Sequence, residues 1–273
     1  MAFETDSTSL NEVLAILNNQ YGYDFSQYSQ ASLIRRVNRI CTLNAIENIA
    51  DLKFKLVNEK GFVTEFVEEI TVNVTEMFRD PSFYKSLKKN VFSYLATYPQ
   101  IRIWSAGCST GEEPISLAIA LEEAGLLHKS TIYATDLNQT VLQKAKKGIY
   151  HLDSLALHSK NYIEAGGQHS LSEYYLVKYG AAIFSPHIRK RIVYSQHSLV
   201  SDNGFNSFHL IVCRNVLIYF NQPLQNRAVD LFFNSTEGTG FLALGNKESL
   251  RFTEYFSQYE TIDRNERIFK KIL

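Results

Sequence analysis

The sequence predicts an α/β chain in three parts: an all-helical N-terminal region, a doubly wound sheet, and a small antiparallel β-subdomain inserted in that sheet. Apolar residues recur at helical spacing through residues 1 to about 75, with no strand alternation. Strands and helices then alternate from residue 101 onward, which is typical of a parallel sheet covered by helices. The segment from about 166 to 196 breaks that rhythm with two short alternating runs, YYLVKYGAAIF and KRIVYSQ. The predicted domains are therefore 1–75 and 76–273, with an insertion at about 166–196.

Composition excludes several classes of protein. The chain has 273 residues, of which 45% are hydrophobic and 21% charged, so a folded globular protein is expected. A formal net charge of zero gives no reason to expect binding to nucleic acid or to an anionic membrane. The polar start is no secretory signal, and no apolar run approaches the roughly 20 residues that span a bilayer. We expect a cytoplasmic protein without membrane insertion.

Three cysteines, Cys41, Cys108 and Cys213, are widely spaced. Their odd number and spacing fit neither a disulfide framework nor a zinc motif. We expect reduced, mostly buried side chains and no metal site.

The helical region contains at least three predicted helices. Ser9 and Glu12 have the spacing of a capping box, followed by an apolar face. A second helix places apolar residues on one side and Arg35, Arg36 and Arg39 on another. Such a basic stripe either docks an acidic partner or is simply a solvated face.

The elements of the sheet domain follow in order. Asp80 and Pro81 are typical of an N-cap and a first helical position. The tail segments are expected to form an antiparallel pair, and Asn138 is expected to cap a helix. The expected strands are 101–107, 131–136, 208–215, 240–245, 259–265 and 267–273, and the expected helices are 112–125, 140–148 and 223–235.

A glycine loop, residues 106–111, joins the first strand to its helix and begins with Ala106 and Gly107. Glycines let the backbone approach a ligand, and the following helix offers free N–H groups. That helix opens with Glu112 and Glu113, which would repel a pyrophosphate and attract a cationic ligand such as an ammonium or a sulfonium. The pattern disfavours NAD and favours S-adenosylmethionine, although a glycine loop alone is a weak signal.

Asp136 ends the second strand, 25 positions beyond Gly111. An acid near that offset accepts the hydroxyls of a ribose at the switch point of such sheets. The alternative is a cap on the next helix, but Asn138 already supplies one, so we favour the ribose role.

Further polar residues mark strand ends and the domain junction. Arg214 and Asn215 follow the strand FHLIVC, and a buried arginine needs either a structural carboxylate or a substrate anion. Tyr219 lies a helical turn further on, and an ordinary core aromatic is the commoner role for a tyrosine. Three polar residues interrupt the apolar segment TVNVTEMFRD, where turn capping is the simple alternative for the first two: Asn73, Thr75 and Arg79.

Four blocks together make the chain resemble the CheR family of chemotaxis receptor methyltransferases: TVNVTEMFRD, IRIWSAGCSTGEEPISLA, TIYATDLNQTVLQKAKKGIY, and FHLIVCRNVLIYFNQPLQ with GFLALGNKESL. The resemblance implies a Rossmann-like S-adenosylmethionine-dependent methyltransferase sheet, a helical N-terminal domain and a β-subdomain insertion. It implies methyl transfer to glutamate side chains of receptors, leaving S-adenosylhomocysteine. It also implies receptor docking on the helix with Arg35, Arg36 and Arg39. Whether a receptor C-terminal peptide binds the β-subdomain stays open.

The resemblance also implies residue roles. Positions matching Asn73, Thr75 and Arg79 line the cofactor or methyl-transfer pocket, and Tyr219 lies near the methyl group. The position matching Glu113 contacts the methionine amino end of the cofactor, and that matching Asp136 contacts its ribose. Ser198 with Leu199 match a pair beside the adenine, and Arg214 with Asn215 match positions near the cofactor. Departures include Met77, Ile115, His209 and Ser198, where the family usually has Phe, Tyr, Asp and Asn. Competing hypotheses are a methyltransferase for another substrate and a non-catalytic regulator that binds the cofactor.

Overall fold

Four helices form the N-terminal part of the computed structural model, which describes residues 5–71 and 75–272. By its internal contacts the chain divides into two units, Met1–Asn73 with Tyr219–Arg227, and Val74–Ile218 with Ala228–Leu273. The helices of the first unit bury the predicted apolar residues, among them Leu10, Val37 and Phe66. Their bounds are α1 Ser7–Tyr21, α2 Gln30–Leu43, α3 Ile49–Asn58 and α4 Lys60–Thr71.

The predicted capping box of α1 is wrong. The N-cap is Asp6, whose carboxylate accepts the backbone N–H of Ser9 at 2.7 Å. Glu12 pairs with Lys53 of α3 instead, at 2.7 Å. The N-cap therefore lies three residues before Ser9 and the helix begins at Ser7, because aspartate caps as well as serine does.

A segment from the far end of the chain belongs to the helical unit. The backbone N–H of Ser29 donates to the carbonyl of Tyr219 at 2.8 Å, and that of Asn221 donates to Gln27 at 3.0 Å. The rings of Tyr28 and Phe220 meet edge to face. The sequence analysis did not predict that residues 219–227 pack with the N-terminal helices.

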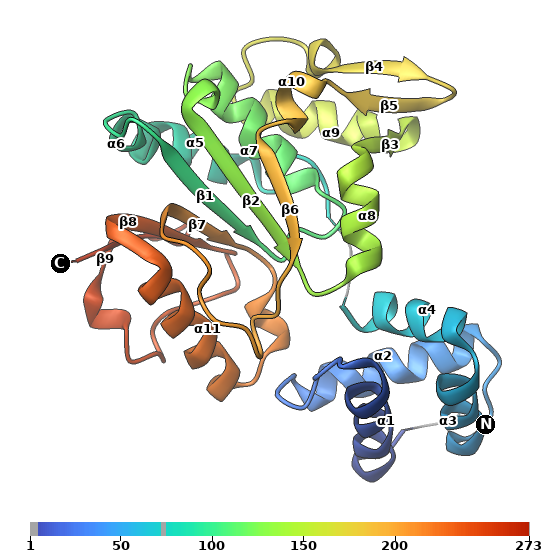
Figure 1. Cartoon of the computed structure of the whole chain (residues 1–273). Coiled ribbons are helices and arrows are strands. Elements are labelled where there is room, and N and C mark those ends of the chain that lie inside the picture. The colour runs from blue at the N-terminus through green and yellow to red at the C-terminus, as the bar shows by residue number, and fades with distance from the viewer. Residues whose placement is uncertain (1–4, 72–74, 273) are drawn as a thin grey trace. The chain divides into compact units, whose positions relative to one another are not determined.

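A seven-stranded sheet forms the second unit, in the order β6-β2-β1-β7-β8-β10-β9 (Figure 1). The first five strands run parallel, and the last two form the predicted antiparallel closing pair. The order reverses between β1 and β7, which is the switch point at which open α/β sheets bind ligands. The bounds are β1 Ile101–Ala106, β2 Ser130–Asp136, β6 Ile192–Gln196, β7 Phe208–Cys213, β8 Thr236–Leu244, β9 Tyr259–Asp263 and β10 Ile268–Lys271.

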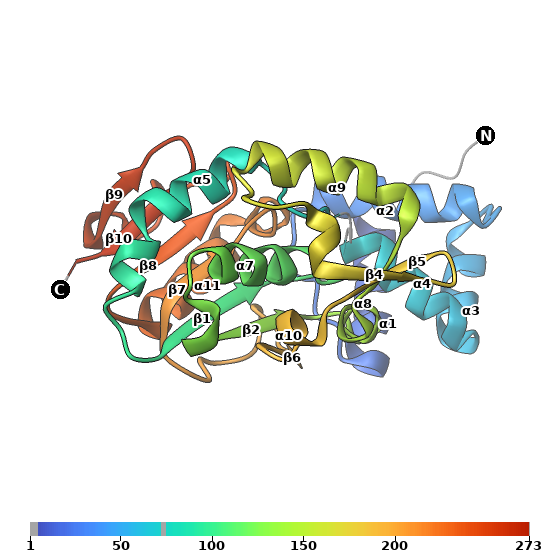
Figure 2. The same ribbon diagram turned by 90° about the horizontal axis from the view of Figure 1, so that it is seen from above.

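Helices precede and connect these strands, and Figure 2 shows α7 lying over β1 and β2. Strand β7 is buried along its whole length, as its apolar sequence predicts. The three cysteines are buried and free. The helix bounds are α5 Pro81–Asn90, α6 Phe92–Leu95, α7 Glu112–Glu123, α8 Gln139–Lys147, α9 Leu152–Glu164, α10 Pro186–Arg189 and α11 Gln222–Ser235, with short 3-10 helices at Leu127–Lys129, Leu171–Tyr174, Leu217–Tyr219 and Phe256–Gln258.

The small antiparallel sheet has the order β3-β5-β4, with bounds Ile149–His151, Ala181–Phe184 and Tyr175–Lys178. The assignment of KRIVYSQ to this subdomain was wrong, because β6 pairs parallel with β2. Strand β3, which lies before residue 166, supplies the third small strand instead. β6 is an edge strand with most of its residues at least partly exposed, so its sequence alternates like an antiparallel strand.

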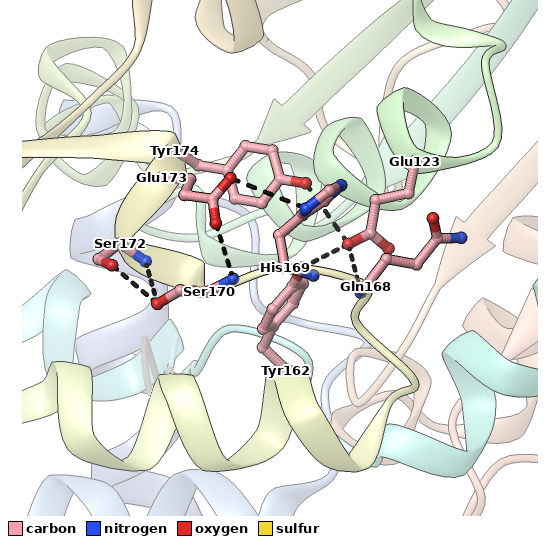
Figure 3. Close-up of polar contacts among 8 residues, drawn as sticks. All are labelled: Glu123, Tyr162, Gln168, His169, Ser170, Ser172, Glu173 and Tyr174. Atoms are coloured by element: carbon pink, nitrogen blue, oxygen red, sulfur yellow. Dashed lines mark hydrogen bonds and ion pairs between the residues drawn. The ribbon is translucent and has the colours of Figure 1, made fainter.

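Glu123, at the end of α7, holds the segment that leads from α9 into β4 of the small sheet (Figure 3). Its carboxylate accepts hydrogen bonds from the Tyr162 hydroxyl and from the backbone N–H of Gln168, and Lys88 pairs with it at 2.8 Å. The Tyr174 hydroxyl, just before β4, also donates to it at 3.4 Å. The segment before β4 is thereby fixed to α7.

Across the described ranges, no helix is long and apolar enough to cross a membrane. The same ranges contain no group of three or more His, Cys, Asp or Glu residues arranged to hold a metal ion.

Candidate cofactor and methyl-transfer site

The glycine loop turns sharply after β1 at the switch point. The backbone N–H groups of Gly107 and Cys108 both donate to the carbonyl of Thr135 in β2, at 2.7 and 2.9 Å. Gly107 and Gly111 have φ of 77° and 94°. Trp104 of β1 stabilises the residue that accepts these bonds, since its indole N–H donates to the Thr135 hydroxyl at 2.8 Å. Ala106 and Gly107 therefore lie where the sequence places them, between β1 and α7.

Gly107 also leaves no room for a side chain. A Cβ built there would lie 2.4 Å from Cγ2 of Val216, which follows β7. We expect Gly107→Ala to lower the free energy of unfolding by about 2–4 kcal/mol, because it combines left-handed strain with overpacking. Urea denaturation measures this. Gly125→Ala is the matched control, since Gly125 has φ of 69° and nothing within 4 Å. Equal losses in the two variants would show that the contact with Val216 is unimportant.

Glu113 lies in the first turn of α7 and points back to the end of β1. The Ser105 hydroxyl donates to its carboxylate at 2.8 Å. Burial raises the pKa of Glu113 to about 7, against the opposing influence of Arg214 and Arg79. Within the described part of the chain Glu113 has no ion-pair partner. An incoming ammonium would supply the missing positive charge.

Glu112 faces a different environment. It is buried, accepts the Thr110 hydroxyl at 2.6 Å, and has a pKa that burial raises to about 7. Its charge acts on Tyr150 and Tyr194 rather than on Arg214. The two glutamates that the sequence treats as a pair are thus separate, and Glu113 is the one beside the loop and β7.

Asp136 binds the loop as well as its own strand end. Its two carboxylate oxygens accept the backbone N–H groups of Ser109 and Asn138, each at 2.9 Å. Burial raises the pKa of Asp136, and these hydrogen bonds oppose the shift. Asn138 caps α8 with its side chain, as predicted. Each oxygen of Asp136 keeps a further lone pair for a ribose hydroxyl.

Ser198 and Leu199 lie beside Asp136, because the preceding residue, His197, donates its N–H to the Asp136 carbonyl at 3.1 Å. The Ser198 hydroxyl accepts the N–H groups of Val200 and Ser201, both at 3.2 Å. This side chain therefore serves a local turn. Leu199 is buried.

Arg214 has a structural carboxylate partner, which decides between the two explanations left open by the sequence. Its guanidinium donates to Asp80 Oδ2 at 2.6 Å and to the Arg79 carbonyl at 3.1 Å. The same group lies 4.0 Å above the ring of Phe83. Asp80 is the N-cap residue of α5 and Pro81 opens that helix, as predicted, but the Asp80 side chain makes no capping hydrogen bond because it pairs with Arg214.

Glu248 is a residue of the site region that the sequence did not reveal. It is buried and accepts four backbone N–H groups, from Gly245, Asn215, Val216 and Leu217. Burial raises its pKa and the four donors oppose the shift. It fixes the loop that follows Arg214. The only signal was an acid soon after the strand GFLALG.

Backbone strain gathers around these residues. Four non-glycine residues at the site have positive φ: Phe78 at 52°, Asp80 at 55°, Ser109 at 50° and Asn215 at 63°. Such conformations persist only where surrounding contacts enforce them, and they concentrate at functional sites.

The remaining predicted residues are only partly placed. Asn73 lies outside the described residues, while Thr75 and Arg79 are half-buried. Arg79 acts on the charge of Glu113, which places the two near each other. Tyr219 belongs to the helical unit, where the guanidinium carbon of Arg36 lies 5.4 Å above its ring. The pairing of Arg79 with Tyr219 stays a prediction.

The residues present fit S-adenosylmethionine. Glu113 offers a half-buried carboxylate to an ammonium, and Asp136 offers oxygens to a ribose at the neighbouring strand end. Among the residues that the structure describes, the buried Ser109 hydroxyl has no hydrogen-bond partner, so a ligand in the glycine loop would supply one.

Comparison with known proteins agrees with this chemistry. Residues 73–264 match the family model for the CheR methyltransferase SAM-binding domain, and residues 8–71 match that for the CheR methyltransferase all-alpha domain. A methyltransferase named Cher3 from Pseudomonas putida is 42% identical over 252 residues, which cover 92% of each chain. A chemotaxis protein methyltransferase of Listeria innocua is 31% identical and covers 86% of this chain and 87% of its own. The cofactor is S-adenosylmethionine, and the chain belongs to the CheR methyltransferase family.

Proposed function

We propose that this methyltransferase esterifies glutamate side chains of chemotaxis receptors, using S-adenosylmethionine. Family membership and the chemotaxis methyltransferases among its relatives support the receptor substrate. The observation that carries the proposal is the half-buried Glu113 at the switch point, which has no ion-pair partner in residues 5–71 and 75–272, together with Asp136 at the neighbouring strand end.

The chemistry requires little acid–base assistance. A glutamate carboxylate has an ordinary pKa of about 4.3, so it is already ionised at neutral pH and needs no general base. The cofactor supplies an electrophilic methyl group on a sulfonium. The chain's residues have to bind that cofactor, orient the carboxylate in line with it and exclude water. Arg79 and Tyr219 are the proposed orienting residues.

The product of transfer identifies the substrate. Incubation with receptor-containing membranes and radiolabelled S-adenosylmethionine should give label on the receptor that alkali releases as methanol, since glutamyl esters are base-labile. Alkali-stable label would indicate another acceptor group. Cofactor binding without any transfer would favour a non-catalytic regulator.

Arg79→Ala tests the role of the arginine. We expect turnover to fall about 10- to 100-fold while S-adenosylhomocysteine affinity stays within about threefold, because one orienting hydrogen bond to a charged group is worth ~1.5–3 kcal/mol. Steady-state kinetics and calorimetry measure the two quantities. Arg79→Lys keeps the charge and is the control. Unchanged turnover would remove Arg79 from the catalytic residues.

The basic residues of α2 are proposed to dock the acidic receptor helix. Arg35 is exposed, and Arg39 is 67% exposed although it pairs with Glu69 at 3.3 Å. Arg36 is largely buried, donating to the Glu69 carbonyl at 3.2 Å. Arg36 therefore stabilises the helical unit, and the docking surface reduces to Arg35 and Arg39.

Charge reversal at Arg35 and Arg39 should raise the KM for receptor about tenfold, because oppositely charged surfaces steer association. Affinity for S-adenosylhomocysteine should not change. Lys146→Glu with Lys190→Glu is a control with the same change in net charge, at exposed positions of the other unit. Similar kinetics in both double variants would argue against docking on α2.

The outer edge of the small sheet is a second proposed receptor contact. Strand β4 pairs with β5 on one side only, and Leu176, at 70% exposure, and Val177 lie on it. An extended receptor C-terminal peptide would add a strand there through backbone hydrogen bonds.

A further inference from the structure

A positively charged cavity lies on the sheet unit, outside the cofactor site. Its volume is about 430 Å³, and it is lined by Ser249, Arg251, Phe252, Arg264, Asn265 and Arg267. The lining contains three arginines and no acidic residue. Guanidinium groups stay charged at any pH that a folded protein tolerates. The cavity therefore presents three positive charges to whatever enters it.

These arginines are not neutralised by the chain itself. Across the described residues, Arg251 and Arg264 have no side-chain hydrogen bond or ion pair, and Arg267 only donates to the Asn246 carbonyl at 3.5 Å. Within the same residues, the carboxylate of the adjacent Asp263 makes no ion pair with them and instead accepts the Ser86 hydroxyl and two backbone N–H groups. Three like charges around one cavity attract an anion, because its binding relieves their mutual repulsion.

The cavity lies at the same edge of the sheet as the cofactor site. The backbone N–H of Leu244 donates to the Arg267 carbonyl at 3.1 Å, and Leu244 also pairs with Cys213, which precedes Arg214. Two strand spacings separate Cys213 from Arg267, or about 10 Å. The segment that carries Arg251 begins just after Glu248, the residue that fixes the loop following β7. The cavity thus flanks the end of β7 on the side away from β1.

Phe252 indicates the kind of ligand. Its ring is 78% exposed beside the guanidinium groups. An exposed aromatic next to arginines suits contact with a protein surface, in which aromatic and arginine residues are enriched. Carboxylates fit guanidinium groups through paired hydrogen bonds. Charge complementarity therefore favours an acidic protein segment.

We propose that this cavity docks acidic side chains of the protein substrate that lie one to two helical turns from the reacting glutamate. Two turns of helix rise about 11 Å, close to the two strand spacings that separate the cavity from the end of β7. The proposal rests on the proposed receptor substrate. It adds a contact on the methyltransferase unit to the one proposed on α2.

The test uses the full-length double variant Arg251→Glu with Arg264→Glu. We expect its KM for receptor to rise about tenfold with kcat within about twofold, because the side chains bind substrate remote from the reacting atoms. Affinity for S-adenosylhomocysteine should stay unchanged. Lys146→Glu with Lys190→Glu is the matched control, since both lysines are exposed, neither lines the cavity and the change in net charge is equal. Equal KM values for the two double variants would overturn the proposal.

A direct binding assay separates this proposal from the proposed function. A fluorescein-labelled, glutamate-rich peptide from a receptor methylation helix should bind the wild-type protein and the lysine control, but bind the arginine variant more weakly, by anisotropy. If the wild-type protein methylates no receptor, this assay still shows whether the cavity binds an acidic peptide. If pyrophosphate raises the melting temperature of the wild-type protein alone, and the peptide binds all variants equally, the cavity is a phosphate site and the proposal is wrong.

Discussion

Replacing Glu113 with glutamine should weaken the binding of S-adenosylhomocysteine about 10- to 150-fold. The ligand's ammonium would lose a charged hydrogen bond in a half-buried setting, and such bonds contribute ~1.5–3 kcal/mol. Isothermal calorimetry measures the change. Glu112→Gln makes the same chemical alteration one residue away, where the carboxylate accepts the Thr110 hydroxyl. That control should bind within about twofold of the wild-type protein.

The pH dependence gives the same residue a second signature. Burial raises the pKa of Glu113 to about 7 in the ligand-free protein, and an ammonium bound beside it would lower that pKa. Affinity should therefore fall as the pH drops below about 7, by up to tenfold per pH unit, because the ligand then competes with a proton. Glu113→Gln should flatten this part of the profile. Parallel profiles in the two proteins would show that another group governs the dependence.

Arg214→Ala should be the most destabilising single change at the site, costing about 3–5 kcal/mol of the free energy of unfolding. The Arg214 side chain is only 2% exposed. Its removal leaves the Asp80 carboxylate without its ion-pair partner and the Arg79 carbonyl without the guanidinium donor. It also empties the space above Phe83. Urea denaturation gives the value.

A double-mutant cycle with Asp80→Ala separates the ion pair from the packing. The two substitutions together should cost clearly less than their sum, because each alone leaves an uncompensated charge. Strict additivity would mean that Arg214 stabilises the fold through Phe83 and the Arg79 carbonyl, and not through the carboxylate.

Local patterns in the sequence predicted most of the architecture. Alternating strands and helices, the buried run of β7 and the cap at Asn138 all express short-range rules of burial and hydrogen bonding. Strand β6 was assigned to the wrong sheet because an exposed edge strand has the same alternation whether its neighbour is parallel or antiparallel. Pairing direction depends on distant chain, which periodicity does not record.

The same limit applies to the site. The positions of Glu113 and Asp136 beside the glycine loop were predictable because each lies at a defined offset from it, whereas their contacts with the cofactor stay predictions. The partner of Arg214 is 134 residues away in sequence, and nothing local distinguished Asp80 as an ion-pair partner from Asp80 as a helix cap. The membership of Tyr219 in the helical unit likewise arises from backbone bonds to residues near position 28.

Helix α7 carries an acid with a distinct position at each end. Glu113, in its first turn, belongs to the candidate cofactor site, and Glu123, its last residue, holds the segment that leads into β4 of the small sheet. Ten residues of α-helix set these two carboxylates about 15 Å apart along the axis. The length of the helix therefore fixes this distance, because one inserted residue would shift its far end by about 1.5 Å and rotate it by about 100°. The number of residues between Glu113 and Glu123 therefore sets how far a peptide bound at the small sheet lies from the cofactor site. We expect relatives that keep both acids to keep this number of residues between them.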